Sequence, residues 1–231
     1  MFNLVSLMVL AIFNLILFAG MFQVYSRTKN RHFYYTAFFF LACGLVQIEQ
    51  YILESGVPAD WAVLINRLQA MGLISFLHLI PLFTLYFTGE KIRVSRRLGL
   101  AILTLALIGI TIFTNLVIQD RPENRLGYLE GKHGVLYPFV IILIGLIGIH
   151  FLVRIALLGR RNLGKPVNYY GIMAGIVITL IAGVATFWEV TAKRNLIAAI
   201  PEPFFIGLGA LSFSFAWIIL VQYSWLFSSL D

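Results

Sequence analysis

Residues 2–25 read FNLVSLMVLAIFNLILFAGMFQVY, a continuous apolar run that contains no charged side chain. A helix rises about 1.5 Å per residue, so a run of this length crosses a hydrocarbon layer about 30 Å thick. Six further runs of similar length follow. The seven predicted transmembrane helices are Phe2–Tyr25, Phe33–Leu53, Trp61–Thr88, Leu98–Ile118, Tyr137–Leu158, Tyr169–Val190 and Phe204–Phe227.

Composition agrees with a membrane-embedded chain. Of the 231 residues, 60% are hydrophobic and only 12% are charged, and the mean hydropathy is +0.91. The apolar runs are continuous rather than alternating with polar residues, which favours helices over a barrel. The first run lacks a preceding positive charge and a small-residue cleavage site, so we expect it to be retained. The sequence therefore predicts an all-α membrane protein, a single seven-helix domain over residues 1–231.

Charges in the short loops predict the orientation of the bundle, because cytoplasmic loops are enriched in Lys and Arg. One side carries ten: Arg27, Lys29, Arg31, Lys91, Arg93, Arg96, Arg97, Arg160, Arg161 and Lys165. The other side carries five: Arg121, Arg125, Lys132, Lys193 and Arg194. We expect the amino terminus outside and the carboxyl terminus in the cytoplasm. The net charge of +7 then reflects topology, and no nucleic-acid partner is expected.

The longest loop follows the fourth apolar run. Between Arg125 and Tyr137 it places turn residues between short apolar stretches, which is typical of a small β-hairpin capping the outer face. Aromatic residues near the span ends, Tyr128 among them, are typical of an interfacial belt. The single cysteine, Cys43, provides neither a disulfide framework nor a cysteine-based metal site, and no metal is expected.

Polar residues inside the spans are the candidates for function, because they are costly in hydrocarbon and face the bundle interior. Glu49 and Arg67 lie at similar depth on adjacent antiparallel helices, so we expect them to form an ion pair. Such a pair can set helix register, or it can form the polar floor of an outward-facing ligand pocket. A third interpretation is that these side chains extend separately to the lipid headgroups. The candidate ligand-binding residues are Glu49, Gln50, Arg67, Gln69, Trp188 and Glu189.

Two histidines lie deeper in the spans. His78 and His150 start from the same side and reach comparable depth. They can be structural, proton-coupled, or axial ligands of a haem; the structural reading is preferred, and no cofactor is expected.

Enzyme and receptor signatures are missing. The sequence contains no glycine-rich phosphate loop, no His-Glu-x-x-His pair and no Gly-x-Ser-x-Gly elbow. The last helix has no lysine for a retinal Schiff base, and the third and seventh helices lack the motifs of G-protein-coupled receptors. We therefore expect no enzymatic activity from these residues.

Several short motifs point to a family. They are Trp61-Ala-Val-Leu-Ile-Asn-Arg67-Leu-Gln-Ala-Met-Gly72, Ile80-Pro81-Leu-Phe-Thr-Leu-Tyr-Phe-Thr-Gly89, Glu49, Thr114-Asn115 and Gly134-Val-Leu-Tyr137. Together they resemble the amino-terminal seven-helix sensor region of bacterial histidine kinases, a module that also precedes diguanylate cyclases. Members of that family continue into a cytoplasmic output domain. By this resemblance the chain is either the sensor part of a longer protein or a module that acts through a partner.

The resemblance implies a sensor in the bacterial inner (cytoplasmic) membrane. It would bind a small-molecule or lipid-like ligand in the outer half of the bundle and relay the change through the last helix to a histidine kinase or cyclase. The expected partners are membrane lipid, that ligand, the cytoplasmic output domain and a second copy of the chain. Two alternatives stay open: a small transporter or channel, and a haem- or quinone-binding membrane subunit.

Overall fold

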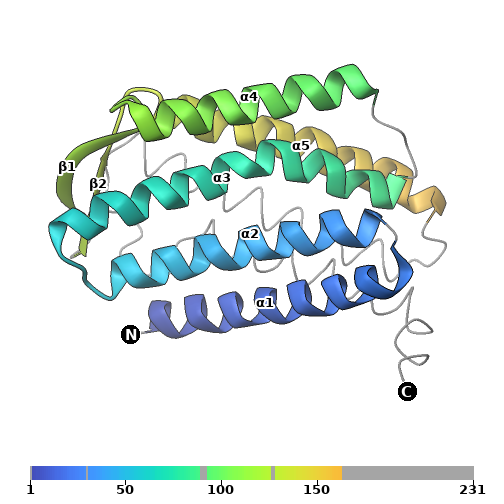
Figure 1. Cartoon of the computed structure of the whole chain (residues 1–231), viewed down its shortest axis with the longest axis horizontal. Coiled ribbons are helices and arrows are strands. Elements are labelled where there is room, and N and C mark those ends of the chain that lie inside the picture. Colours follow the sequence, from blue (N-terminus) through green and yellow to red (C-terminus); the bar gives the residue numbers. More distant parts are fainter. Residues whose placement is uncertain (1, 30, 89–92, 126–127, 163–231) are drawn as a thin grey trace.

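The computed structural model describes residues 2–29, 31–88, 93–125 and 128–162 (Figure 1). Its elements are α1 (Phe2–Thr28), α2 (Arg31–Glu54), α3 (Ala59–Thr88), α4 (Val94–Phe113), β1 (Ile118–Arg125), β2 (Tyr128–His133) and α5 (Tyr137–Asn162). The predicted sixth and seventh helices lie outside the described residues.

Four of the helices are long and apolar enough to cross a membrane. The spans are Leu7–Thr28, Phe33–Glu54, Ala59–Leu82 and Val94–Phe113, and the apolar part of α5, Tyr137–Gly148, is shorter. Large apolar side chains remain exposed along them, including Leu98, Ile102 and Leu105 on α4. An exposed apolar surface of this extent is what a lipid-facing helix needs and a water-facing one avoids. The chain is therefore a multi-pass membrane protein.

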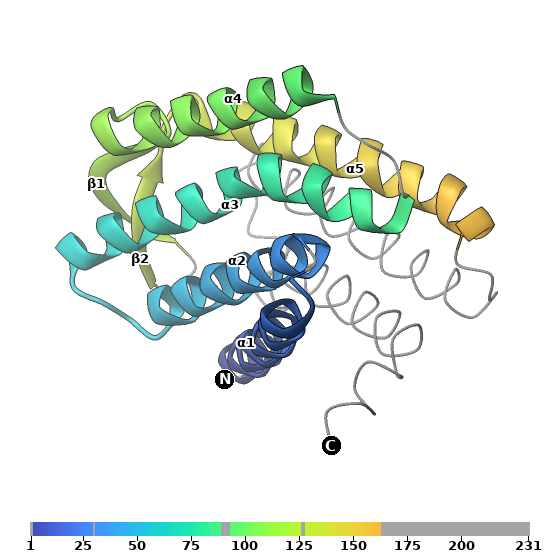
Figure 2. The same ribbon diagram turned by 45° about the vertical axis from the view of Figure 1, so that its right-hand side comes forward.

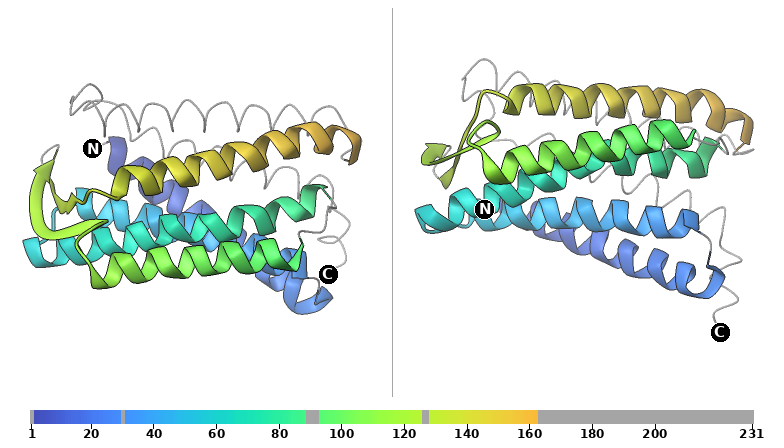
Figure 3. Two further views of the ribbon diagram at one scale, coloured as in Figure 1. Left: turned by 90° about the horizontal axis from the view of Figure 1, so that it is seen from above. Right: turned by 45° about the horizontal axis from the view of Figure 1, so that its top comes forward.

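Helix α3 is the centre of the described bundle. It packs against α2, α4, α5 and both strands, whereas α1 packs mainly against α2. The turned views show α3 lying between α2 and α4, with the two strands crossing one end of the helices (Figures 2 and 3). The amino terminus lies at this same end (Figure 1), which we call the hairpin end.

Aromatic rings fill the contact between α2 and α3. Phe39 and Phe76 meet edge to face with ring centroids 5.6 Å apart, and both side chains are fully buried together with Phe40, Ile74 and Leu77. Edge-to-face pairs of this kind add to the contribution of the buried area itself. The contact fixes how the two helices sit beside each other.

The predicted hairpin is present, but it begins earlier than expected and shortens the fourth helix. We predicted that helix to continue to Ile118, whereas α4 ends at Phe113 and Thr114 is extended, with φ −136° and ψ 164°. Val117 and Ile118 are apolar because they are fully buried where the hairpin begins, and Ile118 is the first residue of β1 rather than part of a span. Strand β1 then pairs antiparallel with β2, with a register shift between Ile118 and Pro122.

Glycines allow two close approaches near the hairpin end. A methyl group on Gly131 of β2 would lie 2.7 Å from Cγ2 of Ile118 and 3.4 Å from Cα of Val63, so the hairpin lies flat on α3. A methyl group on Gly72 of α3 would lie 2.7 Å from Cγ2 of Val46 on α2. The second contact brings the backbone of α3 against α2, as small residues do in membrane helix pairs.

The Gly72 contact generates a packing prediction. Gly72→Ala should lower stability by about 1–3 kcal/mol, because the added methyl overlaps Val46 and forces the helices to adjust. Gly109→Ala on α4 is the control, since a methyl there meets nothing within 4 Å, and it should be neutral. The measurement is the unfolding midpoint in micelles. Equal midpoints for the two variants would show that α2 and α3 do not approach closely at Gly72.

Candidate functional site

Four buried polar side chains and the half-buried Glu54 form a network at the hairpin end. Gln69 on α3 donates from Nε2 to Oε1 of Gln50 on α2, at 2.8 Å. Gln50 in turn donates from Nε2 to the hydroxyl of Tyr128 on β2, at 3.1 Å, and to Oε1 of Glu54, at 3.0 Å. Asn66 donates to Oε1 of Gln69 at 3.4 Å. The network joins α2, α3 and the hairpin, so the predicted candidates Gln50 and Gln69 are in direct contact.

Arg67 fastens the hairpin and the end of α4 to α3. Its Nη2 lies 2.8 Å from Oδ1 of Asp120 on β1 and donates to Oδ1 of Asn115 at 2.8 Å and to the carbonyl of Ile118 at 3.3 Å. Its Nη1 donates to the carbonyl of Ile112 at 3.1 Å. The last carbonyls of a helix have no intrahelical partner, and the guanidinium fork satisfies one of them while holding the strand that follows. We call this set of contacts the Arg67 clamp.

The predicted ion pair between Glu49 and Arg67 is wrong. Arg67 pairs with Asp120 instead, because the chain leaving α4 turns back over the start of α3 and brings a loop carboxylate within reach. Oε2 of Glu49 is buried and has no hydrogen-bond partner among the described residues. It lies beside Gly72, 3.8 Å from where a methyl on that glycine would be. Glu49 therefore faces α3 at a different place from the clamp.

The remaining predicted site residues, Trp188 and Glu189, lie outside the described residues. Of the six candidates, the structure places Glu49, Gln50 and Gln69 where α2 and α3 face each other, whereas Arg67 points from α3 toward α4 and the hairpin. Gln50 and Gln69 are bonded to each other, Arg67 belongs to the clamp, and Glu49 stands apart from both.

Sequence reasoning missed the contributions of Tyr128, Asp120 and Asn14. Tyr128 is buried against the network rather than lying in an interfacial belt. Asn14 is fully buried in the middle of α1 and donates to Oε1 of Gln47 on α2 at 3.0 Å. A lone asparagine within an otherwise apolar span was a usable signal for Asn14, since such residues turn toward neighbouring helices.

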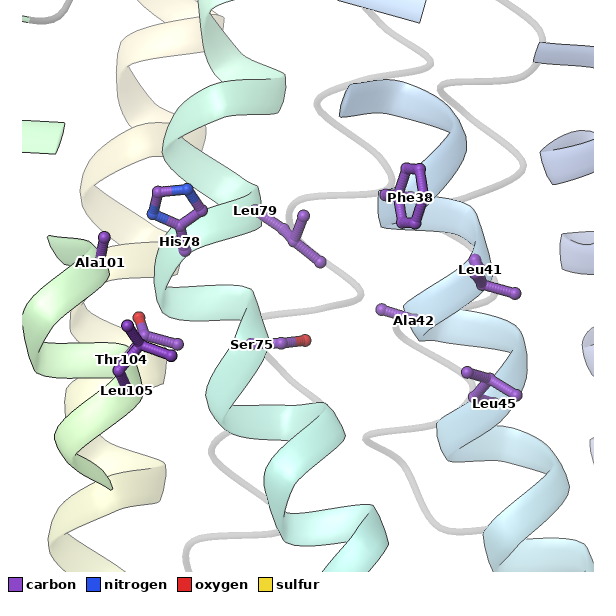
Figure 4. A pocket seen from close by; sticks show the side chains of 10 residues that line it. All are labelled: Phe38, Leu41, Ala42, Leu45, Ser75, His78, Leu79, Ala101, Thr104 and Leu105. Carbon is purple, nitrogen blue, oxygen red and sulfur yellow. The ribbon is translucent and has the colours of Figure 1, made fainter. Parts of the chain in front are cut away.

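A groove lies between α2, α3 and α4, nearer the middle of the bundle. It has a volume of about 460 Å³ and is lined by Phe38, Leu41, Ala42, Leu45, Ser75, His78, Leu79, Ala101, Thr104 and Leu105. Figure 4 shows Ser75 and Leu79 pointing from α3 toward α2, while His78 lies on the side of α4.

The hydroxyls of the groove bond to their own helices, Ser75 to the Gly72 carbonyl and Thr104 to the Leu100 carbonyl. Nδ1 of His78 is buried without a hydrogen-bond partner among the described residues. The other transmembrane histidine, His150, is exposed on α5 and does not line this groove. His78 is therefore the polar side chain of this groove whose ring nitrogen lacks a hydrogen-bond partner within the described part of the chain.

No model of a known protein family matches the sequence, and no curated protein is detectably similar to it.

The network generates a prediction about coupling between two amides. Gln69→Leu should cost roughly 1–3 kcal/mol, because Oε1 of Gln50 is then buried without its donor. The double variant with Gln50→Leu should cost less than the sum of the two single losses, since no orphaned acceptor remains between the helices. Gln23→Leu, at an exposed position of α1, is the control. Strictly additive losses in a double-mutant cycle on unfolding in micelles would show that the two amides do not interact.

Proposed function

We propose that this chain is a signal-sensing protein of the bacterial cytoplasmic membrane. In this proposal a ligand binds in the outer half of a seven-helix bundle, and the rearranged helices pass the change to an output domain or partner in the cytoplasm. The resemblance of the Trp61–Gly72 and Ile80–Gly89 motifs to histidine kinase sensor regions motivates the proposal. The transfer through the seventh helix falls on residues outside the described part of the chain and stays a prediction.

The observation that carries the proposal is the buried polar network beneath the hairpin. Gln50, Gln69 and Tyr128 connect three elements through single hydrogen bonds, and several buried polar atoms around them have no partner among the described residues, including Oδ1 of Asn66 and Nε of Arg67. A ligand that satisfies such atoms would favour one arrangement of α2, α3 and the hairpin over another. Differential affinity for two arrangements is what a sensor requires.

The distribution of polar groups favours a sensor over a transporter. A conduit needs polar side chains from one face to the other. In the described spans, the buried amides and Glu49 lie between the middle of the bundle and the hairpin end. Toward the opposite end of α2 and α3 the contact is filled by Phe39, Phe40 and Phe76. This arrangement suits a pocket that opens on one side.

Orientation is tested by cysteine labelling. The proposal puts the hairpin outside, so Glu123→Cys on the exposed part of β1 should react with a membrane-impermeant maleimide in intact cells. Ser95→Cys, beside the basic residues that begin α4, should react only after permeabilisation. The native Cys43 is fully buried and should give little background. The reverse pattern of labelling would invert the proposed topology.

Coupling across the bundle is tested by pulsed electron spin resonance. Spin labels at Ser26→Cys and Ser95→Cys, both exposed at the end opposite the hairpin, report the separation of α1 and α4 in a Cys43→Ala background. Breaking the network with Gln69→Leu should shift their distance distribution, because α2 and α3 connect the two ends. Gly109→Ala should leave it unchanged. An unchanged distribution in a folded Gln69→Leu variant would contradict a sensing role for the network.

A further inference from the structure

The groove on the α2–α3 face runs toward an acidic residue. Leu45 lines the groove on α2, and Glu49 follows it by four residues, one helical turn nearer the hairpin end. On the facing helix Ser75 lines the groove, and Gly72 precedes it by nearly one turn. Glu49 Oε2 lies 3.8 Å from the position that a methyl on Gly72 would occupy. Glu49 does not itself line the groove; it lies one helical turn beyond Leu45, on the hairpin side of the groove and at the contact between the same two helices.

This groove is open to the surroundings of the bundle. Leu45 and Leu105, on opposite walls, are 45% and 67% exposed, and the walls belong to helices that span the membrane. A molecule already dissolved in the bilayer can enter such a groove sideways. The length from Phe38 to Glu49 along α2 is about 16 Å at the rise of an α-helix, which fits one extended alkyl chain of about twelve carbons.

The chemistry of Glu49 selects the head group. A carboxyl group at this depth requires a hydrogen-bond donor or a cation as partner. The two terminal nitrogens of Arg67 bond to Asp120, Asn115 and backbone carbonyls instead of to Glu49. Within the described ranges no other side chain bonds to Oε2 of Glu49. A ligand that complements the Glu49 carboxyl group therefore has a head group that donates hydrogen bonds and carries positive charge.

We propose that the groove binds a single-chain cationic amphiphile from the membrane, with its ammonium at Glu49 and its alkyl chain between α2 and α3. Identifying this amphiphile as the signal rests on the proposed sensing function. Binding itself can be measured apart from that function.

The test uses a dodecylamine that carries a photoreactive diazirine at mid-chain, added to the full chain in phosphatidylcholine nanodiscs. Cross-links should map to the groove segments 38–45 of α2 and 75–79 of α3. Ala42→Trp fills the groove and should abolish these cross-links. Ala19→Trp, at an exposed mid-membrane position of α1, is the matched control and should keep them. Cross-links spread evenly over exposed leucines of all helices would overturn the proposal and indicate ordinary lipid contact.

Head-group selectivity is tested by competition with unlabelled dodecylamine, dodecanol and dodecanoate. The amine should compete best and the carboxylate worst. Glu49→Gln, which preserves shape, should reduce the advantage of the amine by roughly tenfold or more, as expected for a lost hydrogen bond to a charged group. Equal competition by amine and carboxylate in the unsubstituted chain would overturn the assignment of Glu49. If selective binding is found but dodecylamine leaves the Ser26–Ser95 spin-label distances unchanged, the groove assignment stands and the amphiphile is not the signal.

Discussion

Hydrocarbon offers no hydrogen-bond partner, and this single constraint orders the polar half of the bundle. Each buried amide of the described helices has a partner on a neighbouring helix or on its own helix. Asn14 therefore reaches Gln47, and Gln69 reaches Gln50. These bonds tie α1 to α2 and α2 to α3 at defined depths, whereas apolar side chains alone would allow the helices to slide past one another. Helix register thus depends on a small number of amides.

The same requirement for hydrogen-bond partners holds where the hairpin covers the end of the bundle. Tyr128 joins the amide network from above, and the Arg67 clamp binds the end of α4 and the start of β1. The two sets of contacts use opposite faces of the first turns of α3. Because α3 also packs against α2, α4 and α5, a displacement of the hairpin reaches every described helix except α1 through one element. This places α3 between anything sensed at the surface and the opposite end of the bundle.

The sequence allowed the described helices and the approximate position of the polar cluster to be predicted, since both follow from hydropathy and depth. The end of α4 was predicted wrongly because Val117 and Ile118 are apolar for a different reason: they are buried at the start of the hairpin. The partner of Arg67 was predicted wrongly because only charges within spans were paired, and Asp120 lies in the loop. The groove between α2, α3 and α4 depends on how the helices pack, which periodicity does not specify. His78 could be placed by depth but not assigned to a groove.

The composition of β1 has a consequence for self-association. A two-stranded hairpin has free backbone edges on which a neighbouring chain can add a strand. Here both strands pack on α3 and β2 also contacts α2. Strand β1 carries Pro122, which has no N–H to donate, among charged residues at Asp120, Arg121 and Glu123. Strand addition at the exposed edge is therefore disfavoured. Two copies of this chain in one bilayer therefore have little opportunity to join through the edges of their hairpins.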